Sequence, residues 1–596
     1  MPFADRELAE YPRPQLRRDN WLCLDGTWQF AYDDEDRGLL QRWYTRQGDA
    51  PFEHAIQVPF PPESQDSGMG DAAVHPVVWY RREVTLTVGR HRHVVLHFGA
   101  VDHEADVWVD GEHVGSHRGG YTAFSFDITH ALRPGATHTI VVRAHDDVED
   151  VDLPRGKQDW QPQPHVIWYH RSTGIWRTVW LETVPEQHIV DLSWQIDLDN
   201  ARLDFDLELA APPTDDTVVE VVLSLADTEM GRATTPARAR RLRVSVPVPA
   251  LDNGQARDAY LWTPEHPVLF DVKATLGRGD EATDVVYSYL GVRTTSTESG
   301  RFLLNGRPYT VRAVLEQGYW PDSLYTPPSV DAMRHEVELI KELGFNTARI
   351  HQKIEDPRLL HWADRLGLLL WGELPSAYRY GTRMPTAILT EWLEAVHQQR
   401  NHPSVVTWVP LNESWGVQDI ASRADQQAFA RALADVTRAV DPSRPVISND
   451  GWEHQNSDII GIHDYDHDPD TFESRYANEA ARSTLVRGFG PAGRRMFVGD
   501  AEYVSQPIMI TEFGGVSFQP GERREDGWGY VEEHTAAEWM RRIDGLYRAI
   551  HRSDFVVGSC YTQLTDTLQE TNGLCTADRE PKAPIEMIRR AVLGSA

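Results

Sequence analysis

The chain of 596 residues is too long for one domain, and at about 100 to 200 residues per domain it predicts three or four. Acidic residues number 90 against 59 basic ones, a formal net charge of -31, which argues against a nucleic-acid partner or an anionic membrane surface. The cysteines Cys23, Cys560 and Cys575 lack metal-ligand spacing, which argues against a disulfide framework or a bound metal. The amino terminus is charged and lacks the apolar segment of a secretory signal, so we expect a cytoplasmic protein.

Residues 1–183 show short alternating apolar runs separated by Gly, Pro, Asp and His, as at 26–31, 78–84, 94–98 and 105–109. This pattern predicts a β-sandwich of the jelly-roll type. Asp110-Gly111, between two such runs, predicts a two-residue hairpin turn because both residue types tolerate a positive φ.

Residues 184–296 repeat the β pattern, with apolar runs at 203–209 and 218–223. We expect a second sandwich here, of the immunoglobulin-like type. Beyond Gly291 the pattern changes to strand-like runs that alternate with amphipathic helical stretches. That change is typical of a parallel α/β fold and marks a domain boundary.

Residues 297–596 contain eight strand-like runs, at 309–317, 346–352, 368–375, 405–413, 445–452, 458–465, 507–515 and 556–566. Helical periodicity lies between them at 330–343, 357–366, 387–399, 421–440 and 536–550. Eight strand-helix units in about 300 residues predict a TIM barrel, in which the carboxyl ends of all strands share one face.

Glu413 and Glu512 each end a strand-like run, the fourth and the seventh of the series. A single carboxylate at the end of a buried strand is more often structural than catalytic. Two at the same barrel mouth match the nucleophile and the acid/base of retaining glycoside hydrolysis, which need carboxyl groups about 5 to 5.5 Å apart. Asn412 either holds a sugar hydroxyl or caps a helix, and the sequence leaves both open.

The segments Asn412-Glu413-Ser414-Trp415 and Thr511-Glu512-Phe513-Gly514-Gly515 resemble the acid/base and nucleophile motifs of glycoside hydrolase family 2. The resemblance covers nearly the whole chain, including 174–180 in the first sandwich and 302–308 at the start of the barrel. It implies that Glu413 is the general acid/base and Glu512 the nucleophile, with Asn412 and Trp415 next to the substrate.

The same resemblance implies further site residues. Arg349 would support the charge of the nucleophile and His351 would face the site, although Lys353 stands where the family usually has a proline. On the sixth run, Tyr465 would contact the nucleophile and His463 a sugar hydroxyl. The alternative is that His463 is a buried, hydrogen-bonded core residue.

Three further residues are candidates, two of them because many related barrels carry a tryptophan platform on the eighth strand. Tyr561 on the eighth run, or Trp528 in the insertion before it, would stack on the sugar ring. Glu373, which closes the third run, would bind hydroxyls or cap the next segment.

The fold does not fix the sugar. Glucuronide-cleaving members typically carry Asn-x-Lys after strand eight, and the lysine is missing from 571–575, which counts against uronides. Lys157, Arg155 or Arg379 could substitute from other loops. The segment 314–322 also departs from the sequence common in galactosidase members, so the chain looks like a divergent branch.

We therefore expect a retaining, exo-acting and β-galactosidase-like hydrolase of a small glycoside or oligosaccharide, with no cofactor and no metal. The alternatives are α-L-arabinofuranosidase, β-galactofuranosidase, β-mannosidase or β-glucuronidase activity, or a carbohydrate-binding protein without catalysis. A homo-oligomer is left open.

Overall fold

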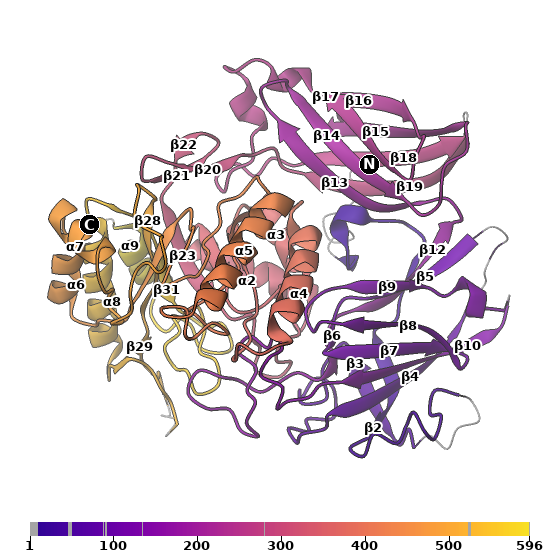
Figure 1. Ribbon diagram of the computed structural model, residues 1–596, viewed down its shortest axis with the longest axis horizontal. Coiled ribbons are helices and arrows are strands. Elements are labelled where there is room, and N and C mark those ends of the chain that lie inside the picture. Colours follow the sequence, from indigo (N-terminus) through magenta and orange to yellow (C-terminus); the bar gives the residue numbers. More distant parts are fainter. Residues whose placement is uncertain are drawn as a thin grey trace.

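The computed structural model describes residues 10–45, 51–86, 89, 92–133, 135–278, 281–521 and 526–594. The charged amino-terminal stretch on which the cytoplasmic prediction rests lies outside them. Two β-sandwiches precede an α/β barrel along the chain, so the predicted fold class is confirmed. Figure 1 shows the barrel beside the first sandwich, with the second sandwich above both.

The first sandwich packs two antiparallel sheets around a shared apolar core. One sheet has the order β1 (Trp21–Cys23), β12 (Val179–Pro185), β5 (Arg92–Phe98) and β9 (Phe124–Asp127). The other has the order β3 (His54–Val58), β2 (Gly26–Tyr32), β4 (Val77–Thr85), β10 (Thr137–His145), β7 (Glu104–Val109) and β8 (Glu112–Arg118). A short pair, β6 (Val101–Asp102) and β11 (Gly174–Ile175), and the 3-10 turns η1 (Pro14–Leu16) and η2 (Thr129–Ala131) complete it.

The predicted hairpin is present between β7 and β8. Asp110 and Gly111 adopt φ values of 51° and 87°, which this turn requires. The connection from β10 to β11 is long, covers residues 146–173, and runs below the barrel in Figure 1.

The second sandwich has one sheet of order β13 (Ile189–Asp197), β14 (Arg202–Leu209) and β17 (Arg241–Pro247). Its other sheet has the order β16 (Thr228–Pro236), β15 (Thr217–Leu225), β18 (Phe270–Arg278) and β19 (Glu281–Leu290), and the turns η3 (Pro249–Leu251) and η4 (Arg257–Tyr260) follow β17. Alternate apolar side chains of β14 and β15 are buried in one core, as their sequence pattern predicts.

In the described part of the barrel, seven parallel strands form one sheet. Their order is β26 (Val405–Val409), β25 (Leu369–Glu373), β24 (Thr347–Ile350), β23 (Val311–Glu316), β31 (Val556–Thr562), β28 (Ile508–Gly514) and β27 (Ile460–Asp464). Short strands β20 (Thr295–Glu298), β21 (Arg301–Leu304) and β22 (Arg307–Pro308) precede the sheet, and β29 (Val516–Ser517) pairs with β30 (Val531–Glu532) after β28.

The predicted fifth strand, 445–452, is not a regular strand. It touches the fourth through isolated bridges at Val446 and Asp450, with the Ile447 N–H donating to Trp408 O. On its other side, two side chains replace the ladder acceptors: Asp458 Oδ2 accepts the Val446 N–H, and Ser457 Oγ accepts the Ser448 N–H. The segment still occupies the predicted place between the fourth and sixth strands.

All five predicted helices are present, as α2 (Val330–Glu342), α3 (Pro357–Leu366), α4 (Met384–Gln399), α5 (Ala424–Val440) and α8 (Ala536–His551). The described residues also contain α6 (Pro469–Tyr476), α7 (Glu479–Val486) and α9 (Ile585–Leu593), which were not predicted. A large apolar cluster joins these helices to the outer faces of the strands, and a second one fills the barrel interior.

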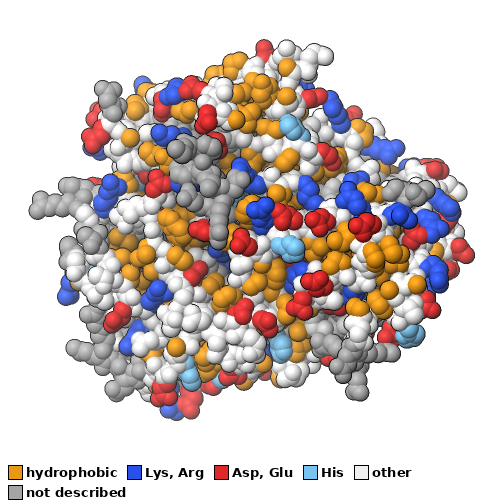
Figure 2. All heavy atoms as spheres, turned by 180° about the vertical axis from the view of Figure 1, so that it is seen from behind, with side chains coloured by type: hydrophobic (Ala, Val, Ile, Leu, Met, Phe, Trp, Pro, Cys, Tyr) orange, Lys and Arg blue, Asp and Glu red, His pale blue; other side chains and the backbone are white. Residues whose placement is uncertain are grey.

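Acidic and basic side chains are interspersed over the face drawn in Figure 2. Among the described residues, no helix combines the length and the apolar character needed to cross a bilayer.

Candidate active site

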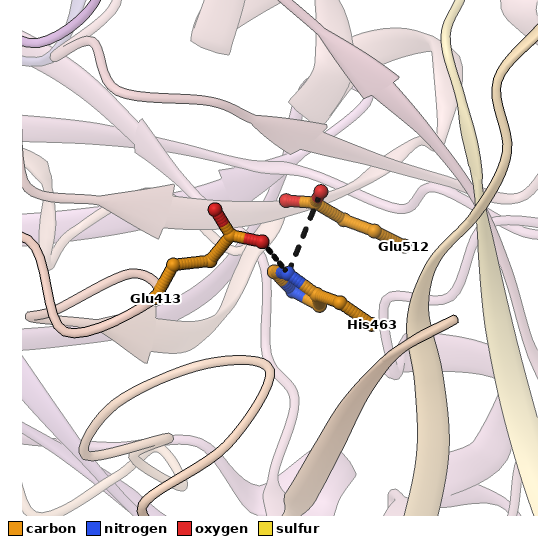
Figure 3. Close-up of side chains that lie close together, drawn as sticks. All are labelled: Glu413, His463 and Glu512. Atoms are coloured by element: carbon orange, nitrogen blue, oxygen red, sulfur yellow. Dashed lines mark hydrogen bonds and ion pairs between the residues drawn. The ribbon is translucent and has the colours of Figure 1, made fainter. Parts of the chain in front are cut away.

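Two carboxylates meet at the carboxyl-terminal face of the barrel. Glu512 lies within β28, and Glu413 follows the end of β26. Side-chain oxygens of both residues and a ring nitrogen of His463 lie within 4.8 Å of one another. In Figure 3 the two carboxylates converge from opposite sides, and His463 contacts both.

The backbone at Glu413 is held in an unusual conformation. Glu413 and Ser414 have φ values of 52° and 59°, a left-handed region that costs roughly 1–2 kcal/mol for a residue other than glycine. Their N–H groups donate to Asp450 O and to Asn449 Oδ1, both at 2.9 Å. The irregular fifth segment thus fixes the turn that aims Glu413 into the mouth.

Glu512 is buried and hydrogen-bonded as an anion. Arg349 Nη1 donates to its Oε1 at 2.9 Å, and the Tyr465 hydroxyl donates to its Oε2 at 2.5 Å. Burial on its own would raise the pKa of the Glu512 carboxyl, but the charges of His463 and Arg349 lower it to about 2. Glu512 is therefore a carboxylate at neutral pH.

Arg349 connects four side chains with oxygen acceptors beneath the pair. It is fully buried, and besides Glu512 it binds Glu373 Oε2 at 2.7 Å, Asn412 Oδ1 at 2.6 Å and Asp450 Oδ2 at 2.9 Å. A planar guanidinium with several donors suits such a set, because it orients each acceptor as well as neutralising charge.

His463 lies between the two carboxylates. Its Nδ1 is 2.6 Å from Glu413 Oε1 and 3.5 Å from Glu512 Oε2, and its Nε2 is 3.4 Å from Asp450 Oδ2. Burial favours the neutral ring, but the carboxylates of Glu512, Asp450 and Glu413 raise the pKa of His463 to about 10. The site therefore holds an imidazolium next to both glutamates.

Family models match the chain in three consecutive pieces. Residues 22–185 match the "Glycosyl hydrolases family 2, sugar binding domain", residues 187–293 "Glycosyl hydrolases family 2", and residues 296–594 the "Glycosyl hydrolases family 2, TIM barrel domain". The chain belongs to glycosyl hydrolase family 2. It is therefore an O-glycoside hydrolase with the architecture that the sequence predicts.

Relatives within family 2 carry more than one activity name. A β-glucuronidase of Paenibacillus borealis is 25% identical over 97% of this chain and 98% of its own length. A β-galactosidase of Thermoanaerobacter pseudethanolicus is 27% identical over 62% of this chain, which spans 48% of that relative. A β-glucuronidase of Ruminococcus gnavus, solved with D-glucuronic acid, superposes with a TM-score of 0.76 at 18% identity, covering 97% of this chain and 99% of its own.

Most of the site residues predicted from the sequence lie together. Eight of them form one connected set around the pair: Glu413, Glu512, Arg349, His351, Glu373, Asn412, His463 and Tyr465. His351 enters through Glu373, whose Oε1 is 2.9 Å from its Nδ1. Trp415, two residues beyond Glu413, instead contacts the rings of Trp168 at 5.9 Å and Tyr378 at 5.7 Å. The roles of these residues remain predictions.

Tyr561 does not reach the site. Its ring is fully buried, with ring contacts to Phe513 and to Tyr547 of α8. Because side chains alternate along a strand, Cys560 joins the barrel-interior cluster and Tyr561 the layer under the helices. Trp528 lies at the mouth, next to Tyr530 at 5.0 Å.

Asp450, Tyr530 and Trp168 also contribute to this site but were not among the predicted site residues. Asp450 lies two residues before the end of the fifth predicted run, so a criterion that includes carboxylates near strand ends, and not only those at the last position, would have found it. Tyr530 stacks on Tyr465 with ring centroids 3.6 Å apart, and Trp168 arrives from the first sandwich. No local sequence pattern identifies Tyr530 or Trp168 as a site residue, because each lies on a long connection that leads to the mouth.

Glu413, His463 and Glu512 also form a group with potential metal ligands. The 2.6 Å contact between His463 Nδ1 and Glu413 Oε1 is a direct hydrogen bond. Ligands at about 2.0–2.2 Å around a zinc ion would be farther apart than this in a tetrahedral arrangement. The residues therefore fit a proton-sharing pair better than a metal centre.

Proposed function

We propose that this family 2 enzyme is a retaining, exo-acting glycosidase that works through a covalent glycosyl-enzyme intermediate. Glu512 attacks the anomeric carbon while the leaving oxygen receives a proton from Glu413. Glu413 then takes a proton from water, which attacks the same carbon and releases Glu512. The single observation that carries the proposal is the approach of Glu413 and Glu512 oxygens to within 4.8 Å, since inverting enzymes need roughly 6.5–9.5 Å to admit a water.

The surroundings of each glutamate support these roles. A nucleophile must be ionised, and Arg349 and Tyr465 both stabilise the Glu512 anion. An acid/base must gain and lose a proton, and Glu413 shares a 2.6 Å hydrogen bond with a protonated imidazole. The proton that the leaving oxygen needs is thus present within the Glu413–His463 pair.

For the glycone, we propose a neutral sugar of the β-galactoside type. A uronate would need a free cation, and the three that the sequence offers each have a carboxylate partner. Lys157 lies 3.9 Å from Glu570, Arg155 3.4 Å from Asp146, and Arg379 2.6 Å from Asp152. Asn572, in the stretch where glucuronidases carry the lysine, accepts a hydrogen bond from Gln563 Nε2 at 2.8 Å.

β-Glucuronide hydrolysis is the second candidate. It is favoured by the name of the Paenibacillus borealis relative, which matches along 97% of this chain. A panel of 4-nitrophenyl glycosides distinguishes the two, with β-galactopyranoside, β-glucuronide, β-mannoside, α-L-arabinofuranoside and β-galactofuranoside measured side by side. Preferred cleavage of the glucuronide would overturn the neutral-sugar proposal and leave the reaction class intact.

The mechanism is tested by Glu512→Gln and Glu413→Gln on the preferred substrate. Glu512→Gln should abolish turnover, because no nucleophile remains. Glu413→Gln should lower kcat by about 10² to 10⁴-fold, the usual contribution of acid/base assistance, and by less when the leaving group is 2,4-dinitrophenol. Glu342→Gln, at an exposed position at the end of α2, is the matched control. Activity that survives Glu512→Gln would contradict the assignment.

A further inference from the structure

Four aromatic rings form a continuous group beside Glu413, which we call the aromatic wall: Trp160, Trp168, Tyr378 and Trp415. Trp168 lies 4.9 Å from Trp160 and 5.9 Å from Trp415, and Tyr378 lies 4.8 Å from Trp160 and 5.7 Å from Trp415. All four side chains are partly exposed, so they are not simply core.

The wall is built from two domains. Trp160 and Trp168 belong to the β10–β11 connection of the first sandwich, whereas Tyr378 and Trp415 follow β25 and β26 of the barrel. Main-chain bonds hold the parts together, since the N–H groups of Arg155 and Gly156 donate to Ser376 O at 3.0 and 3.1 Å.

Side chains reinforce the same contact. The Tyr378 hydroxyl donates to Gly156 O at 2.5 Å and Gln158 O at 2.8 Å. On the opposite side, Gln569 Nε2 donates to Val166 O and Trp168 O, both at 2.9 Å. The wall is therefore fixed in place before any ligand binds, which lowers the entropic cost of binding.

Its position relative to the chemistry indicates which part of the substrate it meets. The acid/base protonates the oxygen that joins the sugar to its leaving group, so the leaving group lies on the Glu413 side of the pair. Trp415 lies two residues beyond Glu413 in the sequence. Its ring contacts Trp168 and Tyr378, so the wall adjoins the chain segment that carries the acid/base. The other aromatic pair at the mouth, Tyr465 and Tyr530, adjoins the nucleophile instead, through the bond from Tyr465 to Glu512.

We propose that the aromatic wall is the leaving-group subsite and that it selects glycosides with a flat, apolar aglycone, an aryl group above all. Aromatic side chains bind such faces by stacking, which contributes about 0.5–1.5 kcal/mol per ring pair beyond the area buried. The inference rests on the proposed function and deepens it. It makes the first sandwich a determinant of substrate choice.

The test compares two non-hydrolysable inhibitors that share the preferred glycone, a phenyl thioglycoside and a methyl thioglycoside. Trp168→Ala should raise the inhibition constant of the phenyl compound about 10-fold, the upper end of one stacking contact, and leave that of the methyl compound within about 2-fold. Trp168→Phe should restore most of the affinity for the phenyl compound. Phe489→Ala, which removes an exposed ring from the barrel outside the wall, is the control.

Equal losses for both inhibitors would show that Trp168 only positions Glu413, and no loss for either would show that the wall does not bind the leaving group. Either result overturns the inference while hydrolysis by the wild type still supports the proposed function. A thioglycoside with glucose as the leaving group separates an aryl subsite from one for a second sugar, because tighter binding of glucose than of phenyl would contradict the aryl preference. If the wild-type protein hydrolyses no glycoside of the panel, the proposed function itself is wrong.

Discussion

At the scale of single residues, the site is a balance of buried charges. Arg349 and protonated His463 face the carboxylates of Glu373, Asp450 and Glu512, and each cation contacts more than one of them. The pKa of Glu512 falls from 4.5 to about 2 on folding, so its ionised form adds stability above about pH 4.5, and that contribution is lost as the pH falls toward 2. Removing one partner would leave a buried charge without compensation, which is strongly destabilising.

Tyr465→Phe tests how far one hydrogen bond keeps the nucleophile ionised. A hydrogen bond to a charged group contributes about 1.5–3 kcal/mol, so we expect kcat/KM to fall roughly 10- to 100-fold. The lost donor stabilised the anion, so the pKa of Glu512 rises and the acid limb of the kcat/KM profile moves to higher pH. Tyr561→Phe, behind the same sheet, should change neither quantity. A Tyr465→Phe profile with an unmoved acid limb would refute this role.

Site residues at the ends of regular strands could be predicted from the sequence, whereas those on long connections between elements could not. Glu413 and Glu512 were predictable because a carboxylate after an apolar run has few structural explanations once two share a barrel mouth. The resemblance to barrels with an aromatic platform on the eighth strand predicts Tyr561 at the mouth, but the face on which its ring lies depends on which residues alternate inward, and a shift of one residue reverses it. Tyr530 and Trp168 lie on long connections, and no local sequence pattern predicts the path of such a connection through the fold.

At the scale of elements, the fifth barrel segment also shows what a local sequence pattern cannot predict. Its apolar residues predicted a strand, and their place in the barrel was right. The hydrogen-bonding partners on one side turned out to be the side chains of Ser457 and Asp458, so regular pairing is lost there. Polar side chains that compete for main-chain groups are not visible in apolar periodicity.

Gly367 at the end of α3 offers a quantitative test of how the domains meet. Its φ is +77°, and a Cβ at this position would lie 2.3 Å from the carbonyl oxygen of Pro264, in the second sandwich. Gly306 has a similar φ of +72° but open space around it. Gly306→Ala should cost about 1–2 kcal/mol for the backbone alone, and Gly367→Ala should cost clearly more because the contact with Pro264 must also open.

The two alanine variants are compared by urea unfolding under identical conditions. Equal losses of unfolding free energy in the two variants would mean that α3 and Pro264 move apart to admit the new Cβ at no cost in free energy. The difference between the two values, rather than either value alone, measures the rigidity of this contact.

At the scale of the whole molecule, a buried acid joins the first sandwich to the barrel. Glu391 of α4 accepts a hydrogen bond from the Tyr121 N–H at 2.6 Å and is 2% exposed. The pKa of Glu391 is raised to about 8, mainly by burial and also by the nearby charges of Asp102 and Glu394, while the Tyr121 N–H and Arg177 act in the opposite direction. The folded protein therefore binds this proton more tightly than the unfolded chain does.

The contribution of protonated Glu391 is fully present below about pH 4.5 and is lost as the pH rises through 8, on the order of 1 kcal/mol per pH unit in between. Glu391→Gln mimics the protonated acid, so its Tm should exceed that of the wild type at pH 8.5 and approach it near pH 5. Glu394→Gln on the same helix, where the pKa is lowered instead, should show no such gain at high pH. A Glu391→Gln difference that does not vary with pH would contradict this account.

The β10–β11 connection has a consequence for synthesis of the chain. Gln569, which binds the carbonyl oxygen of Trp168, follows it by 401 residues. At translation rates of about 5–20 residues per second, Trp160 and Trp168 wait roughly 20 to 80 s for that partner after they leave the ribosome. A nascent chain that has already folded its first sandwich thus carries two uncovered tryptophans, and these are the surfaces on which a chaperone or a neighbouring nascent chain would act.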